Sequence, residues 1–144
     1  MTSILRVSAG ILTRGQQLLI CQRRARDPHP LKWEFPGGKA DEGEESAACL
    51  RRELREELAI EATIGAELHR ATHTYDNGRT VALTFMHVPT YTGELRNLQF
   101  QTVAWVEPAD LLAYDFLEGD LPFVTALARG DWARIFVDPD RHRP

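Results

Sequence analysis

Residues 33–60 decide how this chain folds, and they read WEFPGGKADEGEESAACLRRELREELAI. The second half of this stretch, residues 44–58, is rich in Ala, Leu, Glu and Arg and contains neither Gly nor Pro. This composition predicts an α-helix. Residues 36–38 just before it, Pro-Gly-Gly, predict a turn. The stretch is therefore expected to form a glycine turn that leads into a helix.

The predicted helix carries three carboxylates on one face. Each residue of an α-helix advances by about 100°, so Glu56 and Glu57 fall within about 60° and 40° of Glu53. A separate apolar stripe that includes Leu54 is suited to packing against a core. Like charges at this spacing repel by a few tenths of a kcal/mol, and a divalent cation would turn that repulsion into a binding site. Carboxylate ligands suit Mg²⁺ or Mn²⁺; the alternative is a solvated acidic face.

The turn before the helix offers a second set of groups. Glycine lets the backbone approach a ligand closely, so a free carbonyl of Gly37 or Gly38 could complete a metal shell. Lys39 could neutralise a phosphate oxygen. The alternative is that the turn only makes a tight connection into the helix.

The spacing of these residues closely resembles the signature of the Nudix hydrolases. In that family a Gly is followed by five residues, Glu, seven residues, Arg-Glu-aliphatic, any residue, Glu-Glu, any residue and Gly-aliphatic. The matching positions here are Gly38, Glu44, Arg52, Glu53, Leu54, Glu56, Glu57 and Ile60. Ala59 stands where the family has Gly, and we expect an altered turn there. Residues 32–39, KWEFPGGK, are similar to the MutT branch, the pyrophosphohydrolases of nucleoside triphosphates.

The resemblance implies an α/β fold, the Nudix-type α/β/α sandwich with a mixed β-sheet. It also implies a site for Mg²⁺, for which Mn²⁺ can substitute. The groups that would hold the metal are the Gly38 carbonyl and the carboxylates of Glu53, Glu56 and Glu57. Arg52 would orient Glu53, and Glu44 would pair with an arginine. In the MutT branch a water attacks phosphorus in the triphosphate chain while a carboxylate takes its proton, which releases a nucleoside monophosphate and pyrophosphate.

Further substrate-binding residues are predicted outside the signature. Arg23 or Arg24, in the loop before the glycine turn, could bind the outer phosphates, or the arginines there could simply solvate the loop. Phe35 and Arg79 could border a nucleobase by stacking or cation–π contact. Phe35 could equally be part of the core.

Asp120 is the candidate reader of the base. The resemblance places it where the MutT prototype has an asparagine that reads an oxidised purine. An ionised Asp only accepts hydrogen bonds, whereas Asn both accepts and donates, so Asp120 would favour an edge that presents N–H groups. The alternative is that Asp120 is the N-cap of a helix over residues 121–129. Both 8-oxo-dGTP and cytidine-type triphosphates, such as CTP and 5-methyl-dCTP, stay open as substrates.

Two departures from the family pattern lead to an alternative function. Gln99 stands where many MutT-like proteins have a loop glutamate that ligates metal or acts as a base, and its neutral amide cannot accept a proton at neutral pH. Ala59 is the other departure. Because the three helix carboxylates are intact, we expect an active Mg²⁺-dependent pyrophosphohydrolase that sanitises the nucleotide pool. The alternatives are a catalytically weak nucleotide-binding sensor and a hydrolase of another nucleoside diphosphate derivative.

The remaining pattern predicts several strands and few helices. Strands are expected over residues 4–13, 17–22, 60–75, 79–88 and 101–106, and an irregular loop over 23–36. A short helix is expected from Pro108 through Tyr114, and a last helix over 121–129. We expect one domain over residues 1–130, followed by a partly docked tail over 131–144 that docks through Trp132, Ile135 and Phe136 and then frays.

Composition limits the partners. The 144 residues are 43% hydrophobic and 26% charged, which is ordinary for a globular protein. The 17 Lys and Arg against 21 Asp and Glu give a net charge of −4, which argues against a nucleic-acid duplex as a partner. No apolar run approaches the roughly 20 residues that a bilayer requires, no secretory signal is visible, and Cys21 and Cys49 are too few for a disulfide scaffold. We expect a cytoplasmic monomer or homodimer that acts on a small nucleotide.

Overall fold

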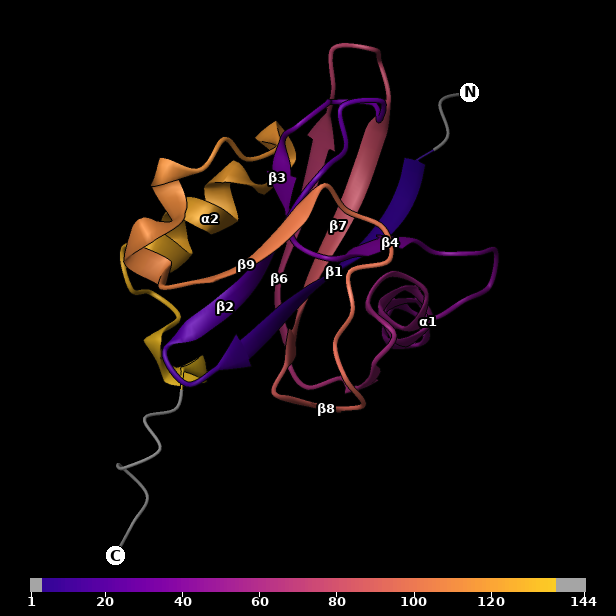
Figure 1. Ribbon diagram of the computed structural model, residues 1–144. Helices are drawn as coiled ribbons and strands as arrows, with labels where there is room; N and C mark the ends of the chain where they lie inside the picture. Colours follow the sequence, from indigo (N-terminus) through magenta and orange to yellow (C-terminus); the bar gives the residue numbers. More distant parts are fainter. Residues whose placement is uncertain (1–3, 137–144) are drawn as a thin grey trace, which may run out of the picture.

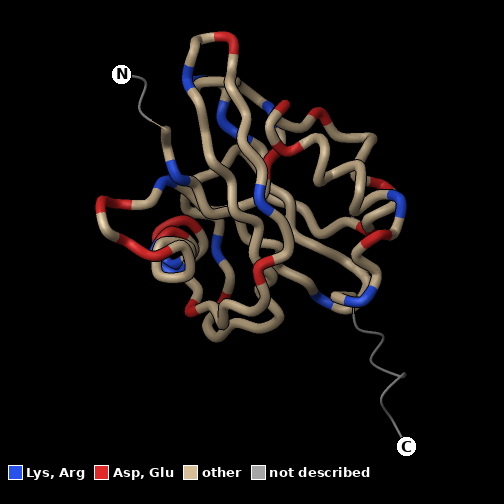
Figure 2. The backbone as a smooth tube through the Cα atoms, turned by 180° about the vertical axis from the view of Figure 1, so that it is seen from behind, with Lys and Arg blue, Asp and Glu red and all other residues tan. Residues whose placement is uncertain are grey.

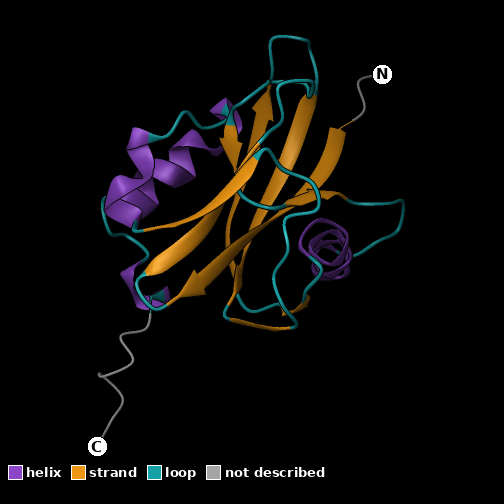
Figure 3. Ribbon diagram, in the orientation of Figure 1, coloured by secondary structure: helices purple, strands orange, loops and turns teal. Residues whose placement is uncertain are grey.

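The computed structural model describes residues 4–136 of the chain. A mixed β-sheet lies between two helical layers, with α1 (Ser46–Leu58) on one face and α2 (Leu121–Ala128) on the other (Figure 1, Figure 3). Short 3-10 segments lie in the C-terminal part: η1 (Pro108–Ala113), η2 (Glu118–Asp120) and η3 (Ala133–Ile135). The predicted α/β/α sandwich with a mixed sheet is confirmed.

The strands of the described residues form one large and one small sheet. In chain order they are β1 (Ile4–Arg14), β2 (Gln17–Gln22), β3 (Trp33–Glu34), β4 (Gly37–Lys39), β5 (Glu61–Thr63), β6 (Glu67–Thr74), β7 (Thr80–Val88), β8 (Thr90–Thr92) and β9 (Thr102–Val106). The large sheet has the order β3-β2-β1-β7-β6, with β4 pairing with β1 and β9 with β2. β1 and β7 run parallel, and the other pairs are antiparallel. β5 and β8 form the small sheet.

Two hydrophobic clusters cover the two faces of the large sheet. On the α2 face the rings of Phe85 and Phe123 stack with their centroids 4.4 Å apart. On the α1 face Leu54, from the predicted apolar stripe, is fully buried in a cluster with Leu12 and Met86. Because this stripe is fixed against the sheet, the rotation of α1 is fixed as well, and so is the direction of its carboxylate face.

The predicted strand over residues 60–75 is wrong, because this segment forms two strands. The chain turns at Gly65, whose N–H donates to the His87 carbonyl at 2.7 Å. β5 pairs with β8 away from the large sheet, and only β6 joins β7. Strand-like composition continues across the turn, so local sequence cannot reveal the change of partner.

Three other predicted segments also differ from the structure in their type or in their bounds. The loop predicted over residues 23–36 contains the short strand β3, which pairs with β2. The short helix from Pro108 is a 3-10 segment that ends at Ala113, and α1 begins at Ser46. Very short strands exist because a partner strand is present, and helix ends depend on local contacts, so neither follows from periodicity alone.

The end of α1 differs from our expectation of an altered turn. Ala59 has φ 60° and ψ 31°, the left-handed conformation that glycine normally takes, and its N–H donates to the Arg55 carbonyl. The helix therefore keeps a left-handed cap despite the alanine. The conformation costs about 1 kcal/mol relative to glycine, because the alanine Cβ crowds the neighbouring carbonyl.

The chain after α2 folds back onto the core. Ile135 and Phe136 are buried, and the ring of Trp132 packs against Phe123 with centroids 5.7 Å apart. Residues 137–144 of the predicted tail lie outside the described residues. Within residues 4–136, no helix combines the length and the apolar character that crossing a membrane requires.

Candidate active site

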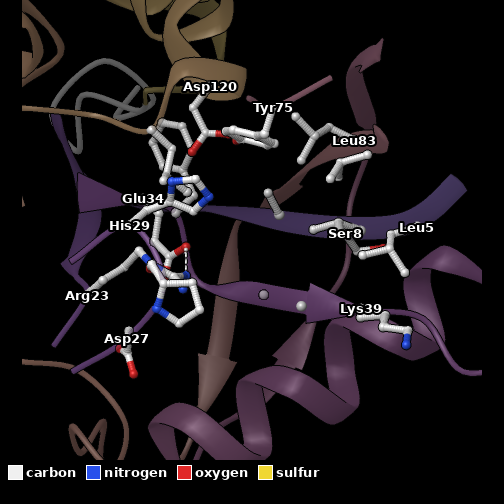
Figure 4. Close-up of a pocket in the computed structure, with 18 of the residues that line it drawn as sticks. Leu5, Ser8, Arg23, Asp27, His29, Glu34, Lys39, Tyr75, Leu83 and Asp120 are labelled. Atoms are coloured by element: carbon white, nitrogen blue, oxygen red, sulfur yellow. Dashed lines mark hydrogen bonds and ion pairs between the residues drawn. The ribbon is translucent and has the colours of Figure 1, made fainter. Parts of the chain in front are cut away.

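A cavity of about 620 Å³ opens where β1, β4 and the β6–β7 hairpin meet (Figure 4). The loop between β2 and β3, the pair Gln99 and Phe100, and the pair Leu117 and Asp120 complete its wall. Segments that are far apart in the sequence therefore surround one cavity.

Gly37 and Gly38 in β4 allow the backbone to lie close to β1 and to α1, respectively. A Cβ on Gly37 would lie 1.9 Å from the Ser8 carbonyl oxygen, and a Cβ on Gly38 would lie 2.5 Å from the carboxyl carbon of Glu53. Gly37 also has φ 148°, a conformation that disfavours any residue with a side chain. The predicted glycine turn is wrong, because Gly37–Lys39 pair with β1 as strand β4. The two glycines are required by close approach at both positions.

Two of the three predicted carboxylates meet this backbone. The Gly37 N–H donates to Glu57 Oε1 at 3.0 Å, and the Glu53 carboxyl lies where a Gly38 side chain would be. Glu57 lines the cavity. Glu56 has 58% of its side chain exposed and faces solvent.

Arg52 ties these carboxylates to the loop before α1. Its guanidinium donates to both carboxylate oxygens of Glu44 at 3.0 Å, to Glu53 Oε1 at 3.0 Å and to the Lys39 carbonyl at 3.1 Å. The hydrogen bonds from Arg52 lower the pKa of Glu44 to about 2. The pairing of Glu44 with an arginine is therefore present, and Arg52 lies where it can orient Glu53.

The carboxyl groups nearest β4 are poorly solvated. Burial raises the pKa of Glu57 to about 9, and the hydrogen bond from the Gly37 N–H acts in the opposite direction. Burial also raises the pKa of Glu53, against the lowering effect of Arg52. A bound cation would favour the ionised form of both groups. Figure 2 shows that Asp and Glu gather on α1 and on the loop before it.

This donor set suits a hard divalent cation. Carboxylate and carbonyl oxygens are the ligands that Mg²⁺ and Mn²⁺ prefer, and the set comprises Gly38, Glu53, Glu56 and Glu57. Within residues 4–136, no three Asp, Glu, His or Cys side chains already converge on one point. Arg52 hydrogen-bonds Glu56 at 3.4 Å, so binding through all three carboxylates requires Glu56 to exchange this contact for the cation.

The predicted phosphate-binding residues are not all in the cavity. Those that line it are Arg23, Lys39 and Arg79. Arg23 Nη1 donates to Glu34 Oε1 at 3.0 Å, which fixes its guanidinium in the wall. Arg24 is not among the residues that line the cavity. The structure therefore offers Arg23, rather than Arg24, to a phosphate group.

Asp120 lies at the other end of the cavity and is only 4% exposed. It occupies the N-cap position of α2, but its side chain makes no capping hydrogen bond. Burial and the nearby Glu34 carboxyl raise the pKa of Asp120 to about 8. The group therefore faces the cavity rather than the helix.

Phe35 fits both of its predicted roles, since it is buried in the core and also lines the cavity.

Glu34 and Tyr75 line the cavity as well, although we did not identify them from the sequence. The signal for Glu34 was an acidic residue between two aromatic ones, directly before the predicted glycine turn. Burial raises the pKa of Glu34, and Arg23 lowers it. The sequence around Tyr75 does not indicate a site residue, because the β6–β7 hairpin is what brings Tyr75 to the cavity.

Gln99 is held in the wall by a loop that is bonded to the end of α1. The N–H groups of Arg96 and Leu98 donate to the carbonyls of the last two residues of α1, each at 2.9 Å. Asn97 Oδ1 then accepts from the Gln99 N–H at 3.2 Å. The backbone at Gln99 is thus fixed in the cavity wall, and the residue there carries a neutral amide where the family resemblance leads one to expect an acid.

Comparisons with known proteins agree with this geometry. The NUDIX domain family matches residues 4–127. Over 124 residues, the chain is 37% identical to the CTP pyrophosphohydrolase of Escherichia coli strain K12, covering 85% of this chain and 90% of that protein. It is 30% identical over 126 residues to the 8-oxo-dGTP diphosphatase of the same strain, covering 87% and 97%. The solution structure of the E. coli ORF135 protein matches with a TM-score of 0.80 at 34% identity, covering 92% of this chain and 94% of that one.

Proposed function

The chain belongs to the Nudix family of hydrolases, and we propose that it is a Mg²⁺-dependent pyrophosphohydrolase of nucleoside triphosphates that sanitises the nucleotide pool. One observation carries this proposal. The cavity is lined by Gly38 and Glu57 and also by Glu34, Tyr75 and Asp120. We call Gly38 with Glu53, Glu56 and Glu57 of α1 the metal end, and Glu34, Tyr75 and Asp120 the base end. The cavity volume of about 620 Å³ lies in the range of small-molecule sites.

Different residues along the cavity would bind the metal, accept a proton and bind the phosphate chain. At the metal end, Gly38 and the three carboxylates would hold Mg²⁺, which when bound neutralises phosphate charge and acidifies a water. Arg52 would keep Glu53 oriented, and a carboxylate of α1 would take the proton of the attacking water. The phosphate chain would be bound by Arg23, Lys39 and Arg79. The products would be a nucleoside monophosphate and pyrophosphate.

The base end favours a base that presents N–H groups. When ionised, Asp120 and Glu34 only accept hydrogen bonds, which suits the N4 amino group of cytosine. When protonated, Asp120 can also donate, which suits the mixed N–H and carbonyl edge of 8-oxoguanine. The similarity to proteins named CTP pyrophosphohydrolase and 8-oxo-dGTP diphosphatase supports the same two candidates. We place the cytidine-type triphosphates first, because a protonated carboxyl still accepts a hydrogen bond through its carbonyl oxygen and because the identity is 37% to the CTP pyrophosphohydrolase against 30% to the 8-oxo-dGTP diphosphatase.

Incubation with Mg²⁺ and a panel of triphosphates tests this proposal. The panel contains CTP, dCTP, 5-methyl-dCTP and 8-oxo-dGTP, and the products are resolved by chromatography. We expect monophosphate and pyrophosphate, with one base favoured about tenfold or more over the others. Release of orthophosphate alone, or turnover that persists after the metal is chelated, would contradict the proposed reaction.

A nucleotide-binding sensor is the second candidate, and Gln99 is the observation that favours it. If the loop position needs an acid for proton transfer or metal binding, its amide leaves an enzyme that binds but barely turns over. Tight binding of a triphosphate, with no product from any member of the panel, would establish that the protein is a nucleotide-binding sensor. Gln99→Glu should then produce measurable turnover.

We also propose that the protein acts in the cytoplasm. Its two cysteines, Cys21 and Cys49, are free and buried in the structure, as is usual for proteins of reducing compartments. Its assembly as a monomer or a homodimer stays a prediction.

A further inference from the structure

The Tyr75 side chain is fixed at the base end of the cavity. Its backbone N–H donates to the Arg79 carbonyl at 2.9 Å, and its carbonyl accepts from the Gly78 N–H at 2.8 Å. Its ring packs against two histidines, with centroids 4.8 Å from His29 and 4.4 Å from His73. The hydroxyl is thus presented by a ring whose position is determined from several sides.

Gly119 lets this hydroxyl lie against the chain next to Asp120. The Gly119 N–H donates to Tyr75 Oη at 3.3 Å, and a Cβ on Gly119 would lie 2.7 Å from Oη. Gly119 is not one of the glycines with positive φ. Its lack of a side chain, and not its backbone conformation, is therefore what Tyr75 requires.

The proton of the Tyr75 hydroxyl is available to a ligand. A phenol can donate one hydrogen bond in addition to accepting. Within residues 4–136, the structure pairs Tyr75 Oη only with the Gly119 N–H, and that contact uses the oxygen as an acceptor. Because Tyr75 lines the cavity, its remaining donor can serve a molecule bound there.

Two carboxyl groups complement this donor. Figure 4 shows Asp120 and Tyr75 close together and pointing toward one another, with Glu34 in the same wall. Two acceptors match the two hydrogens of an amino group, and one donor matches an adjacent ring nitrogen. A uracil edge offers one N–H between two carbonyls and cannot supply two hydrogens to two carboxylates.

We propose that Tyr75 is a specificity-determining residue that recognises an amino group beside an unprotonated ring nitrogen on the Watson–Crick edge, the pattern shared by cytosine and adenine but not by 8-oxoguanine, which has an N–H there. Its hydroxyl donates to the ring nitrogen while Asp120 and Glu34 accept from the amino group. The inference rests on the proposed function for the location of the base, and it narrows the substrate class. A phenylalanine at position 75 would keep the ring but leave the ring nitrogen unpaired in a buried place.

Equilibrium binding of nucleoside monophosphates tests this inference without turnover. CMP, AMP, UMP and 8-oxo-dGMP are titrated calorimetrically into the wild type and Tyr75→Phe. We expect CMP or AMP to bind best to the wild type and to lose about tenfold in affinity in the variant, while UMP changes little. Tyr91→Phe removes a hydroxyl from β8, outside the cavity, and should bind like the wild type.

Several results would overturn the inference. These are tightest wild-type binding of UMP or 8-oxo-dGMP, no measurable binding of CMP or AMP, or equal losses for UMP and the best amino-bearing nucleotide in Tyr75→Phe. Failure to release pyrophosphate would instead refute the proposed enzyme activity, and it leaves the binding result unaffected. The two failures are therefore distinguishable.

Gly119→Ala provides an independent route to the same hydroxyl. Its Cβ would displace Tyr75 Oη, so the affinity for CMP or AMP should fall about as much as in Tyr75→Phe. The double variant should lose no more than either single variant, because both changes remove one hydrogen bond. Fully additive losses would show that Gly119 acts elsewhere, and melting temperatures identify any variant that is only misfolded.

Discussion

The two ends of the cavity are built in different ways. The metal end is made by one continuous stretch, in which β4 lies against Glu53 and Glu57 of α1, and Glu56 is on the same helix. The base end takes Glu34 from β3, Tyr75 from a hairpin and Asp120 from the segment before α2. Residue spacing alone can specify a site of the first kind, whereas the second kind depends on how distant strands are paired.

This difference predicts that changes at the metal end affect all nucleotides alike, and Glu57→Gln should have the largest effect. Loss of one metal-binding carboxylate should reduce Mg²⁺-dependent turnover of every nucleotide by about 10²–10⁴-fold. The fold should survive, because burial already disfavours the charge of Glu57. Steady-state rates and melting temperatures check this, with Glu42→Gln on the exposed loop as the matched control. Unchanged turnover would refute the metal site.

Gly38→Ala should have the next largest effect. Its Cβ would lie 2.5 Å from the Glu53 carboxyl carbon, so Glu53 must move away from the β4 backbone. We expect turnover to fall about tenfold or more, with the same ratio between nucleotides as in the wild type. Binding of Mn²⁺, followed by its paramagnetic resonance signal, should weaken in parallel. A variant with altered base preference and normal Mn²⁺ affinity would contradict the assignment of metal binding and base selection to separate ends of the cavity.

Asp120→Asn should act at the base end, on the choice of nucleotide and on the pH dependence of stability. Burial raises the folded pKa of Asp120 to about 8 from an unfolded value near 3.8, so the folded state binds the extra proton between these pH values. The contribution of Asp120 to the free energy of unfolding is therefore largest below about pH 4, and it decreases as the pH rises to about 8. The asparagine of the variant does not titrate in this range. The stability of the variant relative to the wild type should therefore increase with pH, by a few kcal/mol at most.

Denaturant unfolding of both proteins at pH 4.5, 6, 7 and 8.5 measures this difference. The stability of the variant relative to the wild type should grow steadily toward high pH. The ratio of its activities on cytidine and 8-oxoguanine nucleotides should also shift, while a change at the metal end leaves that ratio alone. A stability difference that is constant with pH would show that Asp120 is ionised in the folded protein.

Ala59→Gly should give the smallest effect, and a favourable one. Glycine takes the left-handed conformation of residue 59 without crowding, so the variant should be more stable by about 0.5–1 kcal/mol. Turnover should not change. Ala48→Gly, inside α1, is the matched control and should destabilise by about 1 kcal/mol. A destabilised Ala59→Gly would mean that the left-handed cap is not the conformation of this residue.

The sequence allowed more of the metal end to be predicted than of the base end. Glu53, Glu56 and Glu57 were identified because helical periodicity places them on one face, and α1 and its buried stripe are as expected. Asp120 was identified by resemblance, not by periodicity. Glu34 and Tyr75 were missed because strand pairing and hairpin geometry, which bring them together, are not encoded in local composition. The division of residues 60–75 into β5 and β6 was missed for the same reason.

The loop that carries Gln99 also shares hydrogen bonds with the last turn of α1. The amide protons of Arg96 and Leu98 are held by the carbonyls of Leu58 and Glu57, so they exchange with solvent only when the loop and that helical turn separate. The local opening of this part of the wall is therefore coupled to the end of α1. A ligand that protects one of them from hydrogen exchange will protect the other.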